Sequence, residues 1–100
     1  MTLHPMKLVT IVVEAYAREP LVRLLGEVGA HGYTLIHVEG SGSKGDRVAD
    51  LPESANIKFK VIVTAATSER LLERLHNEFF ARYAMVAYES DIRVLRPEKF

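Results

Sequence analysis

A glycine-rich segment, Gly40–Arg47, carries the G-x-G-x-x-G spacing of a dinucleotide-binding turn and follows an apolar run, 33–38, that predicts a strand. In a dinucleotide-binding fold this turn opens into a helix whose N-terminus holds the phosphates. Here Pro52 and a further apolar run from Asn56 leave no room for such a helix. The segment therefore predicts a loop of phosphate-binding composition between two strands, which excludes the dinucleotide-binding fold.

The apolar runs along the chain predict four strands and two helices. The strands are expected at 6–15, 33–39, 56–64 and 85–95, the last with a bulge or bend around 89–91. The first helix follows Pro20 and ends at Gly29, and the second is capped by Thr67 or Ser68. This order predicts an α+β fold, the ferredoxin-like βαββαβ sandwich, with both helices on one face of the sheet.

The strands are apolar enough on both faces to predict an oligomer. The first strand alternates apolar residues on both sides, which is typical of a central strand. Lys58 and Lys60 share one face of the third strand, and their simplest interpretation is solvated charge that protects a sheet edge. Residues 1–100 are expected to form one domain, with a long loop at about 40–55.

Composition excludes several classes of function. The formal net charge of zero argues against nucleic-acid binding, and the absence of cysteine excludes disulfides and thiolate zinc sites. The histidines lack metal-binding spacing, and no serine or carboxylate pattern indicates catalysis, so neither a metal, a catalytic cofactor nor an enzyme is expected. No leader or membrane-spanning run stands out, which predicts a cytoplasmic protein.

The glycine-rich segment is the first candidate anion site. Gly40, Gly42 and Gly45 allow sharp turns that expose backbone N–H groups to an anion. Lys44 and Arg47 add charges that reach phosphate oxygens. A flexible hairpin loop without a ligand is the alternative interpretation.

The last predicted strand holds the second candidate group. Arg93 and Arg96 suit bidentate pairing with phosphate or carboxylate, and the alternative is a salt bridge with Glu89, Asp91 or Glu98. Tyr88 suits stacking on a base, or else packing in a half-buried position.

The order of these motifs over residues 6–97 resembles the PII signal-transduction superfamily. The motifs are Gly32-Tyr33-Thr34, Gly40-Ser41-Gly42, a long loop and 57–63. Segment 54–59 and the pair Ala87-Tyr88 are most similar to the PII-like branch that includes SbtB and the carboxysome-associated CPII. The resemblance implies a homotrimer that binds AMP, ADP or ATP between subunits, with bicarbonate as a second ligand. It also implies regulation of an unidentified target, a bicarbonate transporter or a carboxysome-related protein, through the loop 40–55 (the T-loop).

The resemblance also implies site residues. The nucleotide would contact Thr34, Gly40, Ser41, Gly42, Lys44, Arg47, Lys58, Ala87, Tyr88, Arg93 and Arg96, and bicarbonate would contact Gly42 and Lys44. Thr34 matches the adenine side, Arg93 matches an arginine that reaches phosphates from the neighbouring subunit, and Ala87 and Tyr88 fall where a second nucleotide-side loop is expected. The chain departs from the family's Gly-Asp-Gly-Lys segment, having Ala84–Tyr88 there, and a lysine of the family is replaced by Asn56.

Two other classes share the predicted fold. One is a trimer similar to CutA that binds no nucleotide, and the other is a small dimer similar to stress-responsive monooxygenases. Missing metal ligands disfavour the first, and the missing catalytic constellation disfavours the second.

Overall fold

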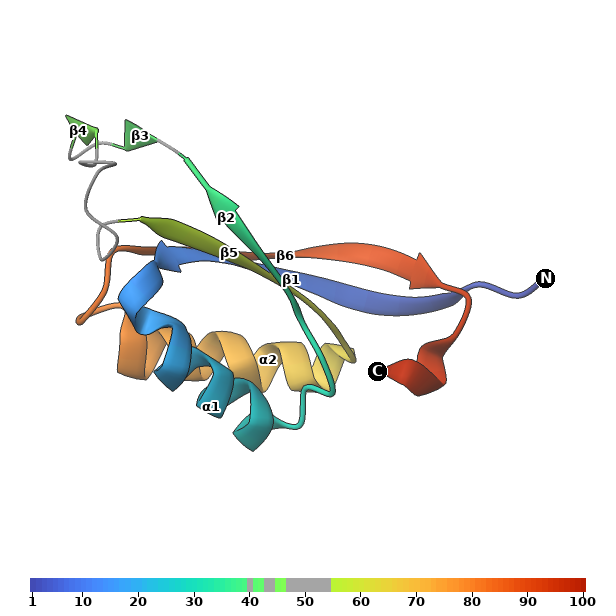
Figure 1. Cartoon of the computed structure of the whole chain (residues 1–100). Coiled ribbons are helices and arrows are strands. Elements are labelled where there is room, and N and C mark those ends of the chain that lie inside the picture. Colours follow the sequence, from blue (N-terminus) through green and yellow to red (C-terminus); the bar gives the residue numbers. More distant parts are fainter. Residues whose placement is uncertain (40, 43–44, 47–54) are drawn as a thin grey trace.

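The computed structural model describes residues 1–39, 41–42, 45–46 and 55–100, with the backbone alone for 41–42 and 45–46 (Figure 1). The main elements in chain order are β1 (His4–Glu14), α1 (Arg18–Val28), β2 (Thr34–Val38), β5 (Asn56–Val63), α2 (Ala65–Arg74) and β6 (Met85–Val94). Shorter elements are η1 (Ala15–Ala17), β3 (Ser41–Gly42), β4 (Gly45–Asp46), η3 (Leu75–Phe79) and η4 (Pro97–Lys99). The predicted α+β, ferredoxin-like order is confirmed.

The main sheet is antiparallel throughout, in the order β2-β5-β1-β6. The central position predicted for β1 is confirmed. The expectation that Lys58 and Lys60 protect a sheet edge is wrong, because β5 lies between β2 and β1. The short strand β2 pairs with the edge of β5 that was expected to face solvent. The residues of a strand do not by themselves determine which strand lies beside it.

The β1–β6 ladder runs without a break from the pair His4↔Val94 to the pair Val13↔Met85. The prediction of a bulge or bend around 89–91 is therefore wrong. The polar residues there are accommodated by partners on the same face: Lys7 Nζ lies 2.5 Å from Asp91 Oδ1 and 3.6 Å from Glu89 Oε2. Ser68 of α2, which is fully buried, donates its hydroxyl to Glu89 at 2.5 Å.

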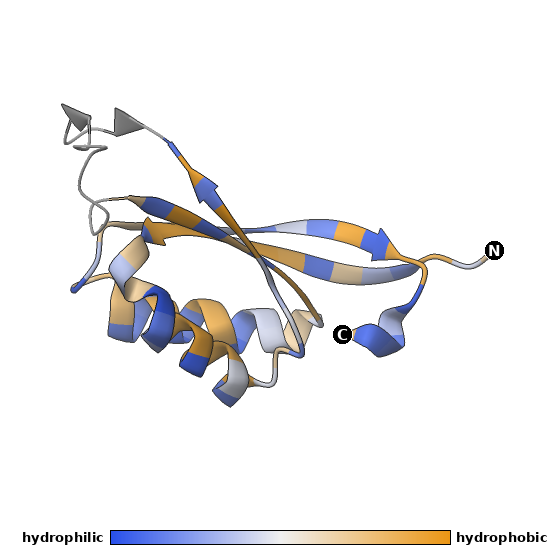
Figure 2. Ribbon diagram, in the orientation of Figure 1, coloured by the Kyte–Doolittle hydropathy of each residue, from blue (hydrophilic) through white to orange (hydrophobic). Residues whose placement is uncertain are grey.

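Both helices cover one face of the sheet, as predicted, and the core lies between the two layers (Figure 1). Figure 2 shows hydrophobic residues along the central strands and on the helices below them. The buried core residues are Val9, Ile11, Val13, Ala17, Leu21, Leu24, Leu25, Val28, Ile57, Phe59, Val61, Val63, Leu71, Leu75 and Phe79. The strand members are all odd-numbered, as the two-residue period of a strand requires. The even-numbered strand residues form the opposite, helix-free face.

The helix ends follow local chemistry. Gly29, at φ 87°, ends α1 in the left-handed conformation, as expected. The cap predicted for the second helix is wrong: Thr64, not Thr67 or Ser68, accepts the N–H of Thr67 at 3.2 Å. The helix starts earlier because Ala65 and Ala66 are strong helix formers and Thr64 is extended.

The predicted long loop is partly structured. Ser41 pairs with Asp46 and Gly42 with Gly45 in the β3–β4 ladder, so a wholly structureless segment 40–55 is not what forms. The rest of that prediction, at residues 40, 43–44 and 47–54, lies outside the described residues. No helix in the part of the chain that the structure describes is long and apolar enough to span a membrane.

Candidate functional site

The structure describes only part of the glycine-rich segment that was predicted to bind phosphate. Gly40, Lys44 and Arg47 lie outside the described residues, and Ser41 and Gly42 are described as the backbone of β3. The anion-binding role of this segment, and the bicarbonate contacts at Gly42 and Lys44, stay predictions.

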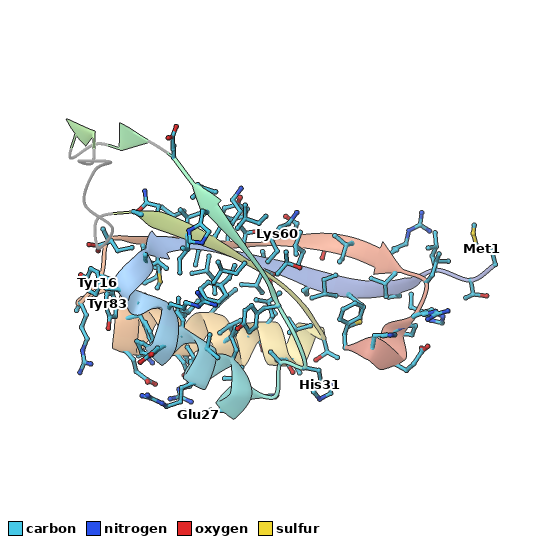
Figure 3. All side chains as sticks on the ribbon, in the orientation of Figure 1. Met1, Tyr16, Glu27, His31, Lys60 and Tyr83 are labelled. Atoms are coloured by element: carbon cyan, nitrogen blue, oxygen red, sulfur yellow. The ribbon has the colours of Figure 1, made fainter. Side chains whose placement is uncertain are left out.

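The helix-free face brings several predicted residues together. Strand pairing sets Thr34, Lys60, Thr10 and Tyr88 in one row across all four strands. The next row holds Ile36, Lys58, Val12 and Val86. Figure 3 shows Lys60 on the side of the sheet away from the helices. Three of the predicted contacts, at Thr34, Lys58 and Tyr88, therefore share one continuous surface.

Ala87 and Tyr88 do not form a loop. Both lie within β6, opposite Ile11 and Thr10 of β1, and their side chains point to opposite faces. The Ala87 side chain packs against the core, whereas Tyr88 is half exposed. The turn that precedes β6 is instead formed by residues 80–84, which the sequence prediction did not single out.

Arg93 and Arg96 lie at the far end of the molecule. Arg93 pairs with Pro5, nine residues along β1 from Glu14, which is about 30 Å at roughly 3.3 Å per residue. Within the described ranges neither arginine has an ion pair, and Lys7 takes the Glu89 and Asp91 carboxylates that were the alternative partners. A single chain therefore cannot bring Arg93 to a ligand held where β2 ends and β5 begins.

The opposite end of the sheet holds a junction that the sequence did not reveal. The Ala84 N–H donates to Glu14 Oε1 at 2.7 Å, and the Ala15 N–H donates to the Ala55 carbonyl at 2.7 Å. The Tyr16 and Tyr83 ring centroids are 5.3 Å apart, and Figure 3 shows both rings at this end. No local pattern could have found these contacts, because they join residues about 40 and 70 positions apart.

An open groove of about 390 Å³ lies between α1 and the segment that runs from the end of α2 through η3 into the turn 80–84. Arg74 crosses it, with Nη1 2.8 Å from Glu27 Oε1 and Nε 2.6 Å from Glu78 Oε2. Hydrogen bonds from Arg74 lower the pKa of Glu78. The hydrogen bond from Lys7 to Asp91 likewise raises the pKa of Lys7 above its ordinary value. Each cluster pairs one cation with two carboxylates, and this net negative charge makes neither the first choice for an anionic ligand.

No group of three or more potential metal ligands gathers among the residues that the structure describes. The four histidines are accordingly scattered over different elements.

Comparison with known proteins places the chain in a family. Residues 6–99 match the family model described as nitrogen regulatory protein P-II. A PII-like signalling protein from Thermus thermophilus is 42% identical, with a TM-score of 0.88 over 100% of this chain and 99% of that chain. CPII, a nitrogen regulatory PII-like protein from Thiomonas intermedia K12, bound to ADP, AMP and bicarbonate, is 32% identical. Its TM-score is 0.90 over 99% of this chain and 96% of that one.

A second CPII structure, bound to ADP and bicarbonate, is 33% identical, with a TM-score of 0.89 over 99% of this chain and 97% of that chain. Identity, coverage and the strand order agree over nearly the whole length. The chain therefore belongs to the PII family and is a PII-like signalling protein.

Proposed function

We propose that this protein is a non-enzymatic sensor that binds an adenine nucleotide, AMP, ADP or ATP, at the contacts between subunits of a homotrimer. Bicarbonate is the proposed second ligand. The likeness to CPII over 99% of this chain carries the proposal, because the CPII structures hold ADP, AMP and bicarbonate.

The position of Arg93 supports a site made by two subunits. Its charge has no ion-pair partner in the described part of the chain, yet it lies about 30 Å from the end of the sheet where β2 stops. A neighbouring copy that supplies Arg93 across the contact resolves this separation. Arg96, the residue before η4, lies beside it in sequence and is proposed to act with it.

The helix-free face supports the trimer. Val86, Tyr88 and Ile36 are 59%, 50% and 41% exposed, and all three lie on this face. An apolar face of this kind in one chain marks an interaction surface. Copies of this chain are the proposed occupants, because the face extends over all four strands of the main sheet.

Contacts to the nucleotide are proposed at the predicted residues, with Thr34, Lys58 and Tyr88 on the helix-free face. Ala87 would contribute only through its backbone, because its side chain packs against the core. Binding is proposed to regulate a bicarbonate transporter or a carboxysome-related protein through the segment 40–55. This regulation is proposed to take place in the cytoplasm.

Isothermal titration with AMP, ADP and ATP, with and without bicarbonate, tests the proposal. Arg93→Gln should weaken nucleotide binding about 10-fold or more, because it removes a charge-assisted contact worth about 1.5–3 kcal/mol. Arg23→Gln, an exposed arginine on α1, is the matched control and should leave binding unchanged. Absence of heat with all three nucleotides at millimolar concentration would reject the proposal and favour a trimer of the CutA type.

A further inference from the structure

We propose that copies of this chain meet head to tail, with Lys58 and Lys60 of one copy held by the Asp91 and Glu89 carboxylates of the next. The inference rests on the homotrimer of the proposed function and names the charged surfaces that form its contact. Each surface is described within a single chain, and the two are complementary in charge and in spacing.

The first surface is the lysine pair on the helix-free face. Lys58 and Lys60 are two residues apart on the central strand β5, so both side chains project from the same side of the sheet. Neither lysine has an ion pair within the described ranges. Among the described residues of the main sheet, the only carboxylate on this face is that of Glu14, whose Oε1 accepts the Ala84 N–H at 2.7 Å. The face therefore carries a surplus of positive charge.

This positive charge needs a partner when the face is covered. Lys58 lies between Ile36 of β2 and Val12 of β1, so a second copy that covers this row places an ammonium group among apolar side chains. Removing an ammonium group from water is costly unless an opposite charge is paired with it. A contact through the helix-free face is therefore favoured where the neighbouring copy supplies carboxylates.

The second surface is acidic and lies on β6. Lys7 Nζ is 2.5 Å from Asp91 Oδ1 and 3.6 Å from Glu89 Oε2, so one cation faces two carboxylates. The buried Ser68 donates its hydroxyl to Glu89 and fixes the position of that carboxylate. The side chains of Asp91 and Glu89 are 86% and 37% exposed. One negative charge is left over, and carboxylate oxygens have further lone pairs for a second cation.

The acidic surface is accessible to a second copy. Glu89, Asp91 and Arg93 follow one another at two-residue intervals, so all three share one side of β6. Figure 1 shows the paired ends of β1 and β6 extending past α1 and α2. A neighbouring copy can approach the sheet there on the side that the helices cover elsewhere.

The spacings of the two surfaces match. Residues two apart on a strand are separated by about 6.6 Å, so the two lysines of β5 are as far apart as the two carboxylates of β6. When β6 of the next copy crosses β5 in the opposite direction, Asp91 lies opposite Lys58. The same alignment places Glu89 opposite Lys60. Both ion pairs form together, and no lysine of the pair is left without a partner.

This alignment also brings Arg93 to its proposed position. Arg93 is the next residue after Asp91 on the same side of β6, so it comes to Asn56, where β5 begins. Within one chain that end of the sheet lies about 30 Å from Arg93. Lys58 has three donor hydrogens, so the contact with Asp91 leaves donors for a ligand oxygen. A contact between two different surfaces of identical copies is head to tail and can close into a ring, as a homotrimer requires.

Carbodiimide cross-linking tests the contact in the wild type, without any nucleotide. The reagent joins an amine to a carboxylate that touches it, and mixing isotope-labelled with unlabelled protein lets mass spectrometry recognise links between copies. The expected links between copies join Lys58 to Asp91 and Lys60 to Glu89. The link from Lys7 to Asp91 within one chain is the internal control, because these groups already touch. Recovery of the control link without either link between copies overturns the inference.

Exchange of the charges is the second test. Lys58→Asp and Asp91→Lys each set like charges against one another across the contact, and each should weaken self-association in sedimentation velocity by about tenfold or more. The double variant restores opposite charges and should recover most of the wild-type association. Arg23→Glu, at an exposed position of α1 outside both surfaces, is the control and should assemble as the wild type does.

The outcomes separate this inference from the proposed function. Single variants that assemble like the wild type, or a double variant no better than the singles, overturn the head-to-tail contact while the trimer stands. A wild type that is monomeric at every concentration rejects the trimer and this contact with it. Absence of nucleotide binding in calorimetry rejects the sensor function but leaves both tests of the contact unchanged.

Discussion

The helix-free face predicts that Val86→Asp breaks self-association. Val86 is 59% exposed and lies on edge strand β6, in the row that continues through Val12 and Lys58. The introduced carboxylate would stand two strand spacings, about 9.6 Å, from Lys58, which is close to one Debye length, so attraction to that lysine would offset little. The substitution therefore replaces apolar contact with a carboxylate in the proposed interface.

The magnitude follows from the exposed fraction. Full burial of a valine side chain is worth about 1.5–3 kcal/mol, so covering the 59% of Val86 that is exposed contributes about 1–2 kcal/mol. Desolvating the new carboxylate adds a further cost of about 1 kcal/mol or more. The association constant at each contact should fall by about 30-fold or more.

Sedimentation velocity over a range of concentrations measures the effect. The wild type should keep a trimer mass at concentrations where Val86→Asp has dissociated. Phe80→Asp is the matched control, because Phe80 is 45% exposed but lies in the turn after η3, beside the helices. A variant with the mass and concentration dependence of the wild type, or a monomeric wild type, would refute the assignment of this face to self-association.

Three further predictions concern stability, each measured by denaturant unfolding. Thr64→Ala removes the cap on the Thr67 N–H and should lower the free energy of unfolding by about 1 kcal/mol, whereas Thr64→Ser should restore most of it. Gly29→Ala should cost about 1–2 kcal/mol from backbone strain at φ 87°, since no atom lies within 4 Å of an added Cβ; an unchanged stability would contradict this. Arg74 lowers the pKa of Glu78, so this pair stabilises the fold above the ordinary pKa of Glu78 and ceases to do so as the pH falls through the lowered one. Arg74→Gln should therefore reduce the loss of stability on acidification in that window, and an identical pH profile would count against the pair.

The order of the elements was predictable because each depends on short-range pattern. Alternation of apolar residues marks 57–63 as a strand, and helical spacing of Leu21, Leu24 and Leu25 marks α1. Gly29 was recognised as a helix end because a left-handed residue is a local requirement. These signals need only the neighbouring residues along the chain.

The candidate site was less predictable. The resemblance placed Ala87 and Tyr88 at a nucleotide-side loop, whereas both belong to β6, as the strand predicted at 85–95 had implied. The bulge expected at 89–91 is absent since Lys7 and Ser68 satisfy the polar residues there from other elements. No sequence pattern predicted the hydrogen bond between Glu14 and Ala84, because the two residues are 70 positions apart in the chain.

The sequence by itself determined the main strands and the two helices, because propensity, capping and periodicity act over a few residues. Only the tertiary structure decided which strands are neighbours. Because β5 has a neighbouring strand on each side, Lys58 and Lys60 lie on a central strand and not at a sheet edge. The strand pairing also set Arg93 about 30 Å from the end of the sheet that holds Glu14 and Ala84. Such long-range relations depend on how the layers pack, and packing is a property of the whole chain rather than of any segment.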